Sequence, residues 1–177
     1  MLGRKQRRTH ERGRQSRGFS LTELMIVLVI LGVLLTVALP GFRNLALATR
    51  LTNYANELVA SVYLARGEAI KRNTDVRLCA STDGASCATA GGWAQGWIIL
   101  DPNDVVLKDH GALSDGFSMI ESSGAHLLSF DSAGVLGGVS DFKLCRAAPS
   151  AGYQERNIAV TALGRTNVTR TNLGVCP

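Results

Sequence analysis

The stretch RGFSLTELMIVLVILGVLLTVALPGF, from Arg17 to Phe42, decides the fold of this chain. It joins a basic head to an apolar run, and one acid, Glu23, stands near the start of that run. The run from Phe19 to Leu39 has 21 residues. As a helix rising about 1.5 Å per residue, it would cover roughly 30 Å, the hydrocarbon thickness of a bilayer. We therefore expect the run to be able to span a membrane.

The positive charge of the chain is concentrated at its N-terminus. Of the 177 residues, 46% are hydrophobic and 19% are charged, which suits one small domain plus one anchoring segment. The formal net charge is +5, but residues 1–18 alone hold seven arginine or lysine residues against Glu11, so the remainder is slightly acidic. A basic head orients the apolar run with its N-terminus in the cytoplasm. We expect the body after Leu39 to lie outside the cytoplasm.

Three interpretations of the N-terminal stretch compete. A secretory signal has an apolar core of about 7–15 residues before a small-residue cleavage site, whereas this core is longer and leads into Pro40-Gly41. A plain membrane anchor leaves Glu23 unexplained, because an acid inside a spanning helix costs on the order of 2–3 kcal/mol and usually marks function. The third interpretation uses every feature: Gly18-Phe19-Ser20-Leu21-Thr22-Glu23 resembles the processing site of type IV prepilins.

This resemblance implies a defined maturation and location. A prepilin peptidase would cut between Gly18 and Phe19 and methylate the new amine of Phe19. Residues 1–18 would be the leader peptide, 19–40 the transmembrane and filament-core helix, and 41–177 a periplasmic pilin-like domain. The chain would be a single-pass inner-membrane protein that enters a type IV pilus after assembly, with other pilins as partners. In a filament core with little water, the carboxylate of Glu23 needs a partner, which the N-terminal ammonium of a neighbouring subunit can supply.

The body of the chain predicts an α+β fold. From Asn44 to about Arg72, apolar residues recur at spacings of three and four, which continues the helix. The whole helix would cover about 50 residues and bend near Pro40, where an amide donor is missing. After Asn73 the pattern changes to short alternating runs broken by turn residues. We predict strands at residues 75–80, 96–101, 117–121, 126–130, 141–145, 156–161 and 165–170. One long N-terminal helix would therefore pack on an antiparallel β-sheet.

Four cysteines fit a compartment outside the cytoplasm. Cys79, Cys87, Cys145 and Cys176 allow three connectivities, and their even number favours disulfides. Pairing Cys79 with Cys87 and Cys145 with Cys176 is the economical choice, although the sequence leaves all three open. By the chain-entropy formula these two loops would stabilise the fold by at most about 2.6 and 3.7 kcal/mol. A zinc site is the rival interpretation, but neither pair has the close C-x-x-C spacing of a structural site.

A second resemblance covers the chain from Arg17 to its end. The run LCASTDGASC is followed by GGWAQGWIILD, LLSFDSAGVLGG, DFKLCR, IAVTALGRTNV and a last cysteine. This series is similar to the GspH/FimT family of minor pilins and minor pseudopilins, and its cysteine pattern and tail are more similar to FimT. The resemblance implies a structural subunit for the assembly or initiation of type IV pili. A minor pseudopilin of a type II secretion system, of the GspH kind, is the alternative.

FimT-like proteins of some naturally competent bacteria bind DNA through a basic C-terminal region with a G-R-x-R pattern. Here Gly164-Arg165-Thr166-Asn167 keeps the first arginine as Arg165, and Asn167 replaces the second. Five basic residues stand against Glu155 alone between 142 and 177: Lys143, Arg146, Arg156, Arg165 and Arg170. Such a patch is typical of contacts to the phosphates of double-stranded DNA, which weaken steeply with salt. Scattered surface arginines are the alternative.

The sequence gives little sign of catalysis. His110 and His126 lack metal-ligand spacing, His10 lies in the leader, and no G-x-S-x-G, Walker-type or H-E-x-x-H pattern occurs. We predict no enzymatic activity, no cofactor and no metal. Trp93 and Trp97 are interpreted as core and turn packing instead of a ligand platform. Asp101-Pro102-Asn103-Asp104 is interpreted as a turn instead of a calcium loop, because Asp and Asn side chains accept hydrogen bonds from nearby amides.

Overall fold

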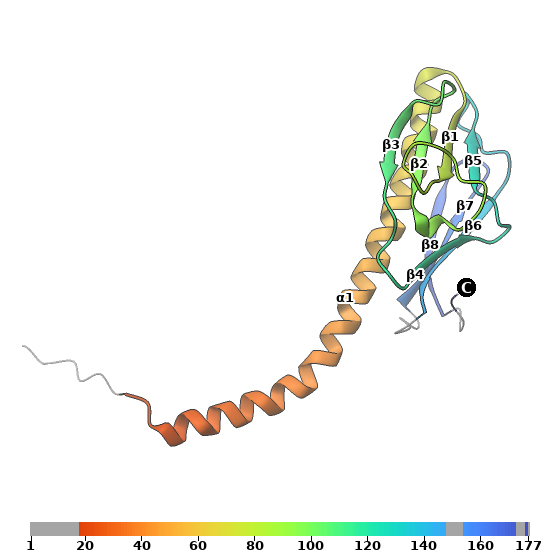
Figure 1. Cartoon of the computed structure of the whole chain (residues 1–177). Coiled ribbons are helices and arrows are strands. Elements are labelled where there is room, and N and C mark those ends of the chain that lie inside the picture. Colours follow the sequence, from red (N-terminus) through yellow and green to blue (C-terminus); the bar gives the residue numbers. More distant parts are fainter. Residues whose placement is uncertain (1–17, 148–153, 173–175, 177) are drawn as a thin grey trace, which may run out of the picture. The chain divides into compact units, whose positions relative to one another are not determined.

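The structure of the chain is a computed structural model that describes residues 18–147, 154–172 and 176, apart from the side chains of 37–41 and 43. Apart from Gly18, the predicted leader lies outside the described residues. The chain divides into two compact units, Met1–Gly41 and Phe42–Pro177. One helix, α1 (Leu21–Arg72), contributes residues to both units (Figure 1). The predicted bend near Pro40 stays a prediction.

The part of α1 that follows Phe42 buries one stripe of small and branched side chains. Each member of the stripe is at most 1% exposed: Leu51, Ala55, Leu58, Val62, Ala65 and Ala69. The helix ends where Asn73 adopts a left-handed φ of 53°. There the amide of Thr74 donates to the carbonyl of Ala69 at 3.2 Å, which satisfies one of the last free carbonyls of the helix. The predicted end at about Arg72 is confirmed.

The strands of the second unit form two antiparallel sheets (Figure 1). The first sheet has the order β3-β2-β1-β5 and consists of β1 (Val76–Ala80), β2 (Trp97–Leu100), β3 (Val106–His110) and β5 (Leu127–Phe130). The second has the order β4-β6-β7-β8 and consists of β4 (Phe117–Glu121), β6 (Ser140–Arg146), β7 (Glu155–Val160) and β8 (Thr166–Thr171). A short 3-10 helix, η1 (Trp93–Gln95), precedes β2.

The expected helix packed on antiparallel strands is confirmed, with two differences. All seven predicted strands are present within two residues at each end, but they divide between two sheets because β4 and β5, although consecutive, pair with different partners. The prediction also missed β3. That strand lies at a sheet edge and alternates poorly between exposed and buried positions, so the polar run Lys108-Asp109-His110 did not indicate a strand.

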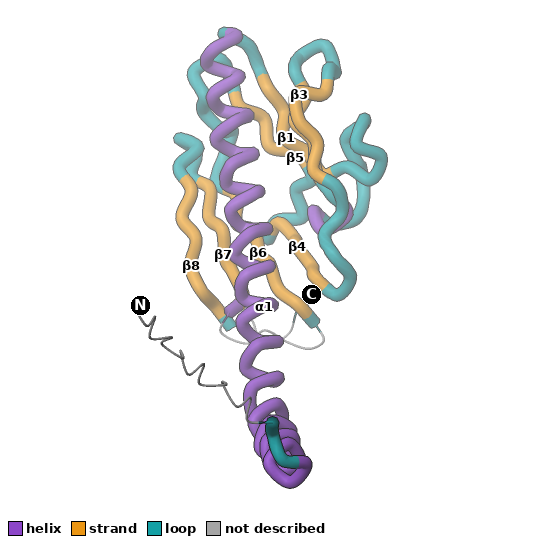
Figure 2. Tube along the Cα trace, turned by 90° about the vertical axis from the view of Figure 1, so that its left-hand side faces the viewer, coloured by secondary structure: helices purple, strands orange, loops and turns teal. Residues whose placement is uncertain are grey.

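The helix packs on both sheets (Figure 2), and the hydrophobic core lies between the helix and the sheets. Trp93 and Trp97 are each 1% exposed, so their interpretation as core residues is confirmed. The indole nitrogen of Trp97 donates to the Ser61 hydroxyl on α1 at 2.9 Å. That of Trp93 donates to the Ala125 carbonyl at 2.8 Å. Each indole therefore buries its ring and keeps its polar group satisfied.

Three turns of the second unit share one construction. They begin at Asp101, Asp131 and Thr161, and in each the first residue's amide donates to the carbonyl four residues later. The side-chain oxygen of that first residue accepts an amide in return. The fourth residue has a positive φ: 61° at Asp104, 74° at Gly134 and 66° at Gly164. Asp101 is thus part of a turn, as interpreted from the sequence, and accepts amide hydrogen bonds from Asn103 and Val105.

Candidate functional site

The predicted processing site lies directly before the start of α1. Gly18 and Phe19 are exposed, with Phe19 at 83%. The Ser20 hydroxyl accepts the amide of Glu23 at 3.3 Å, so Ser20 caps the first turn of the helix. Ser20-Leu21-Thr22-Glu23 has the S-x-x-E order of a capping box, and it places the acid where the positive end of the helix dipole favours it.

The first part of α1 is apolar on every side. Its large apolar side chains between Leu21 and Leu35 are 48–76% exposed in this single chain. A helix that is hydrophobic all round needs a covering surface, which a membrane or a bundle of like helices supplies. Within the residues that the structure describes, no helix is both long and apolar enough to cross a membrane.

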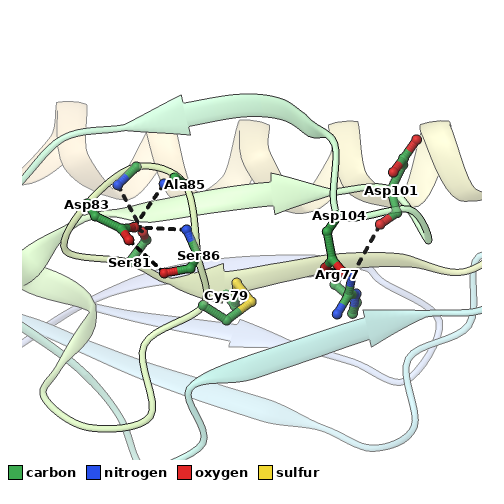
Figure 3. The surroundings of a disulfide bond; sticks show 10 residues. Arg77, Cys79, Ser81, Asp83, Ala85, Ser86, Asp101 and Asp104 are labelled. Carbon is green, nitrogen blue, oxygen red and sulfur yellow. Dashed lines mark hydrogen bonds and ion pairs between the residues drawn. A yellow bond between two sulfur atoms is a disulfide. The ribbon is translucent and has the colours of Figure 1, made fainter.

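Two disulfides tie the second unit together, Cys79–Cys87 and Cys145–Cys176. This is the economical connectivity among the three that the sequence allowed. The first closes the loop after β1, and Figure 3 shows how the Asp83 carboxylate organises that loop. It accepts hydrogen bonds from the Ser81 and Ser86 hydroxyls and from the amides of Ala85 and Ser86. These bonds, the Ser86 hydroxyl first, hold the pKa of Asp83 well below its usual range.

Figure 3 also shows an ion-pair network beside this disulfide. The Arg77 guanidinium donates to the Asp104 carboxylate and, at 3.3 Å, to the Asp101 carbonyl. Asp101 in turn lies 3.6 Å from the Arg72 guanidinium at the end of α1. The strand β1, the turn after β2 and the helix end are thus joined through charges. The described residues contain no group of three or more His, Cys, Asp or Glu side chains that could hold a metal ion.

The structure separates the five basic residues proposed for DNA contact. Arg165 and Arg170 are exposed, at the turn before β8 and within β8. Arg156 is only 4% exposed, and its guanidinium donates to the Thr52 hydroxyl on α1 at 2.8 Å and to the carbonyl of Gln154. Burial, followed by the charge of Arg170, lowers the pKa of Arg156. Arg156 is therefore a structural residue in this chain and not part of a surface patch.

The register of the second sheet explains this separation. Leu144, Arg156 and Arg170 lie opposite one another across β6, β7 and β8, so they share the face that packs toward α1. Lys143 lies opposite Asn157 and therefore points to the other face. Arg146 at the end of β6 lies over the Phe117 ring, 5.0 Å from its centroid. Lys143 thus does not share a face of the sheet with Arg170.

The two described histidines have structural surroundings. His110 is in β3, where its ring stacks on Trp97 with centroids 3.8 Å apart. His126 follows a turn, and its Nδ1 is buried without a hydrogen-bond partner in the described structure. His110 therefore lies in a strand that the sequence did not predict.

Comparisons with known proteins agree with this architecture. The model of the family described as Type II transport protein GspH matches residues 54–164, and the prokaryotic N-terminal methylation motif matches residues 13–39. The pilin-like protein PilA1 of Thermus thermophilus is 49% identical over 69 residues, which cover 39% of this chain and 43% of that protein. A fimbrial protein of Neisseria meningitidis is 37% identical over 73 residues, with 38% and 43% covered. The chain thus spans less than half the length of these curated relatives.

Two solved structures share the fold. The type IV minor pilin FimU of Pseudomonas aeruginosa superposes with a TM-score of 0.54 at 22% identity, covering 68% of this chain and 88% of FimU. The minor pseudopilin EpsH of the Vibrio cholerae type II secretion system gives a TM-score of 0.51 at 11% identity, with 71% and 97% covered. At such identities the likeness shows the fold alone.

A capped apolar helix before a disulfide-linked α+β unit, with a methylation motif at its start, defines a pilin-like structural subunit and not an enzyme. The chain belongs to the GspH family, because that family model matches well over half of its length. It is a minor pilin or pseudopilin, of the kind found in type IV pili or type II secretion systems.

Proposed function

We propose that this chain is a minor pilin that is inserted in the inner membrane, processed after Gly18 and assembled into a type IV pilus. The observation that carries the proposal is the order of its parts. The predicted cleavage pair, Gly18-Phe19, stands directly before a capped helix whose apolar side chains are exposed on all sides. The residues from 41 onward would lie in the periplasm, where disulfides persist. The mature chain would assemble with other pilins through the apolar helix.

Replacement of Gly18 tests the processing step. A Cβ at Gly18 would meet no atom within 4 Å, so Gly18→Leu leaves the fold unchanged and acts only on the peptidase. We expect the unprocessed chain to accumulate in the membrane, whereas the wild type gives a chain that begins at N-methylated Phe19 by mass spectrometry. Gly32→Ala, where a Cβ also has open space, is the control and should be processed normally. Mature-sized Gly18→Leu protein would refute the proposed site.

A pseudopilin of a type II secretion system is the alternative, and the match to the GspH family favours it. Both assignments predict the same processing, so only the phenotype separates them. Deleting the gene and scoring piliation, DNA uptake and exoprotein secretion together is the decisive experiment. Loss of pili with intact secretion supports the FimT-like assignment, and the reverse result supports the pseudopilin.

We also propose that the chain binds DNA during natural transformation. Arg165 and Arg170 support this idea, because both are exposed and neither forms an ion pair with a carboxylate among the described residues. Residues 161–172 contain no acid. The purified mature chain, residues 19–177, in a nonionic detergent should shift duplex DNA with strong salt dependence, and replacing both arginines by glutamine should weaken that shift. DNA uptake that is unchanged in the double variant would exclude this role.

A further inference from the structure

Two glycine turns pack against Arg66 on α1, and Arg165 belongs to one of them. A Cβ at Gly164 would lie 2.7 Å from Arg66 Cδ, and one at Gly134 would lie 3.0 Å from Arg66 Cγ. Both glycines also have positive φ, so the two turns can approach the alkyl stem of Arg66 only because they lack side chains. The Arg66 Nε donates to the Gly134 carbonyl at 3.2 Å. The remaining guanidinium nitrogens have no acceptor among the described residues.

Tyr63 lies one turn away on the same face of α1. It is 48% exposed, and its hydroxyl oxygen accepts a hydrogen bond from the Thr166 hydroxyl at 3.0 Å. The pKa of Tyr63 lies below its ordinary value, mainly because of its hydrogen bonding with Thr166. Desolvation opposes this shift, and the charges of Arg66 and Arg165 lower the pKa by smaller amounts. The hydrogen bond between Tyr63 and Thr166 joins α1 to the start of β8, and the phenol of Tyr63 there lies near the charged side chains of Arg66 and Arg165.

Nearby carboxylates have other partners. Glu57 of α1 pairs with His110, and Glu68 pairs with Lys71 and Arg72. Asp131, in the turn that also carries Gly134, accepts the amides of Ala133 and Val135. Arg66 and Arg165 form no ion pair among the residues that the structure describes. The positive charge at this place is therefore available to an external anion.

We infer that Arg66, Tyr63 and Arg165 form a preformed cradle for one phosphodiester group of bound DNA. This inference rests on the proposed DNA binding and extends that surface from the C-terminal strands onto the helix. Two guanidinium forks and a hydroxyl match the several oxygens of a phosphate, and a guanidinium already fixed in place loses little entropy on binding. Arg170 lies five residues from Arg165, about 16 Å along β8 at the usual rise per residue. A second phosphate of the same duplex can reach it there.

The test measures duplex DNA binding to the mature chain, residues 19–177, in a nonionic detergent by fluorescence polarisation at several salt concentrations. Arg66→Gln should weaken binding about tenfold, because it removes a charged hydrogen-bond donor. It should also lower the slope of log affinity against log salt by about 1. Arg66→Lys keeps the charge, so it should restore the slope and only part of the affinity. Lys108→Gln, which removes an exposed cation on β3 in the other sheet, is the matched control and should bind like the wild type.

The outcomes separate this inference from the proposal on which it rests. If the wild type binds and Arg165→Gln weakens binding, but Arg66→Gln matches Lys108→Gln, the cradle is refuted and DNA binding stands. If the wild type shows no salt-sensitive binding, both are refuted. Polyphosphate should displace the DNA at lower concentration of charge than polyglutamate does, and equal displacement would mean a general attraction to anions and overturn the cradle. If Arg66→Gln does not fold, the DNA affinities of Arg66→Lys and Tyr63→Phe decide the question. Weaker binding in both variants supports the cradle, and wild-type binding in both overturns it.

Discussion

Glu57 of α1 and His110 of β3 are joined by a short contact of 2.8 Å between the Oε2 and Nε2 atoms. The other ring nitrogen of His110 lies 2.7 Å from the Gly111 carbonyl, and the ring stacks on Trp97 at an angle of 3°. Trp97 itself donates to Ser61 on the next turn of α1. The edge strand β3, which has few buried side chains of its own, is therefore attached to the helix through this stack.

His110→Ala should loosen β3 from the helix. The substitution removes the stacked ring above the buried Trp97 and the contact with Glu57, so we expect a loss of about 1–2 kcal/mol in the free energy of unfolding. Urea denaturation followed by tryptophan fluorescence measures it. Glu57→Gln keeps a hydrogen-bonding group but removes the charge, and because this pair is near the surface its loss should stay below about 1 kcal/mol. An equal loss in both variants would mean that the charge, not the stacking, holds the strand.

Glu121 should make the stability of the second unit depend on pH in the acidic range. Burial by itself raises the pKa of this carboxyl, but the Ser123 hydroxyl and the amides of Ala125, Asp141 and Ser123 outweigh it and hold the pKa below its ordinary value. A folded-state pKa below the unfolded one gives stability that is complete above the unfolded pKa, near 4.5, and is lost as pH falls through the folded pKa. Glu121→Gln should therefore cost about 1–3 kcal/mol at pH 7.

The difference in the free energy of unfolding between wild type and Glu121→Gln should shrink as the pH falls below the pKa of the free carboxyl. Unfolding midpoints in urea at pH 7, 5, 4 and 3 would show this convergence. Glu155 is a second buried acid of the same sheet and remains in both proteins, so its titration cancels in the comparison. A difference that stays constant from pH 7 to pH 3 would mean that packing of the side chain, and not its charge, stabilises the loop.

Gly164→Ala should destabilise the chain for two separable reasons. Its φ of 66° is unfavourable for alanine, and the new Cβ would lie 2.7 Å from Arg66 Cδ. We expect a total loss of about 1–2 kcal/mol in the free energy of unfolding. Gly84→Ala is the matched control, because its φ is 70° but a Cβ there meets no atom within 4 Å. The excess loss in Gly164→Ala measures the close approach of the turn to Arg66, and equal losses would show that Arg66 moves away freely.

Much of the fold could be predicted because its signals are local. The short alternating run at residues 117–121 predicted both ends of β4 correctly. The apolar stripe from Leu51 to Ala69 predicted the face of α1 that packs on the core. The division into two sheets could not be predicted in this way. Strand pairing is a non-local property, and β4 and β5 follow each other in the chain although they belong to different sheets. The edge strand β3 was missed because it buries too little to show a period of two.

The candidate site was predictable to a similar extent. The N-terminal motif is contiguous, so Gly18, Phe19 and Glu23 could be named from their order alone. A count of basic residues could not tell that Arg156 faces the helix and is buried, because the face depends on the register of β7. Nor could it find Arg66, which became a neighbour of Arg165 only through the two glycine turns that pack on its stem.

Glu23 combines two roles that a single substitution would confuse. In this chain it is the third residue after the Ser20 cap and lies at the positive end of the helix dipole. In the proposed filament its carboxylate would pair with the N-terminal ammonium of a neighbouring subunit. Glu23→Ala removes both contributions, whereas glutamine is accepted at this position of a capping box and removes only the charge.

We expect Glu23→Ala and Glu23→Gln to be cleaved after Gly18 and to be equally poor at entering filaments. The reason is that a carboxylate buried in an apolar bundle can offset its desolvation only by pairing with a cation, which a neutral amide cannot replace. The measurement compares mature protein in the membrane fraction with protein in sheared filaments by immunoblotting. Thr22→Ser, which keeps a hydroxyl beside Ser20, is the control and should assemble normally. If Glu23→Gln assembles like the wild type while Glu23→Ala does not, the acid serves the start of the helix and the pairing argument is wrong.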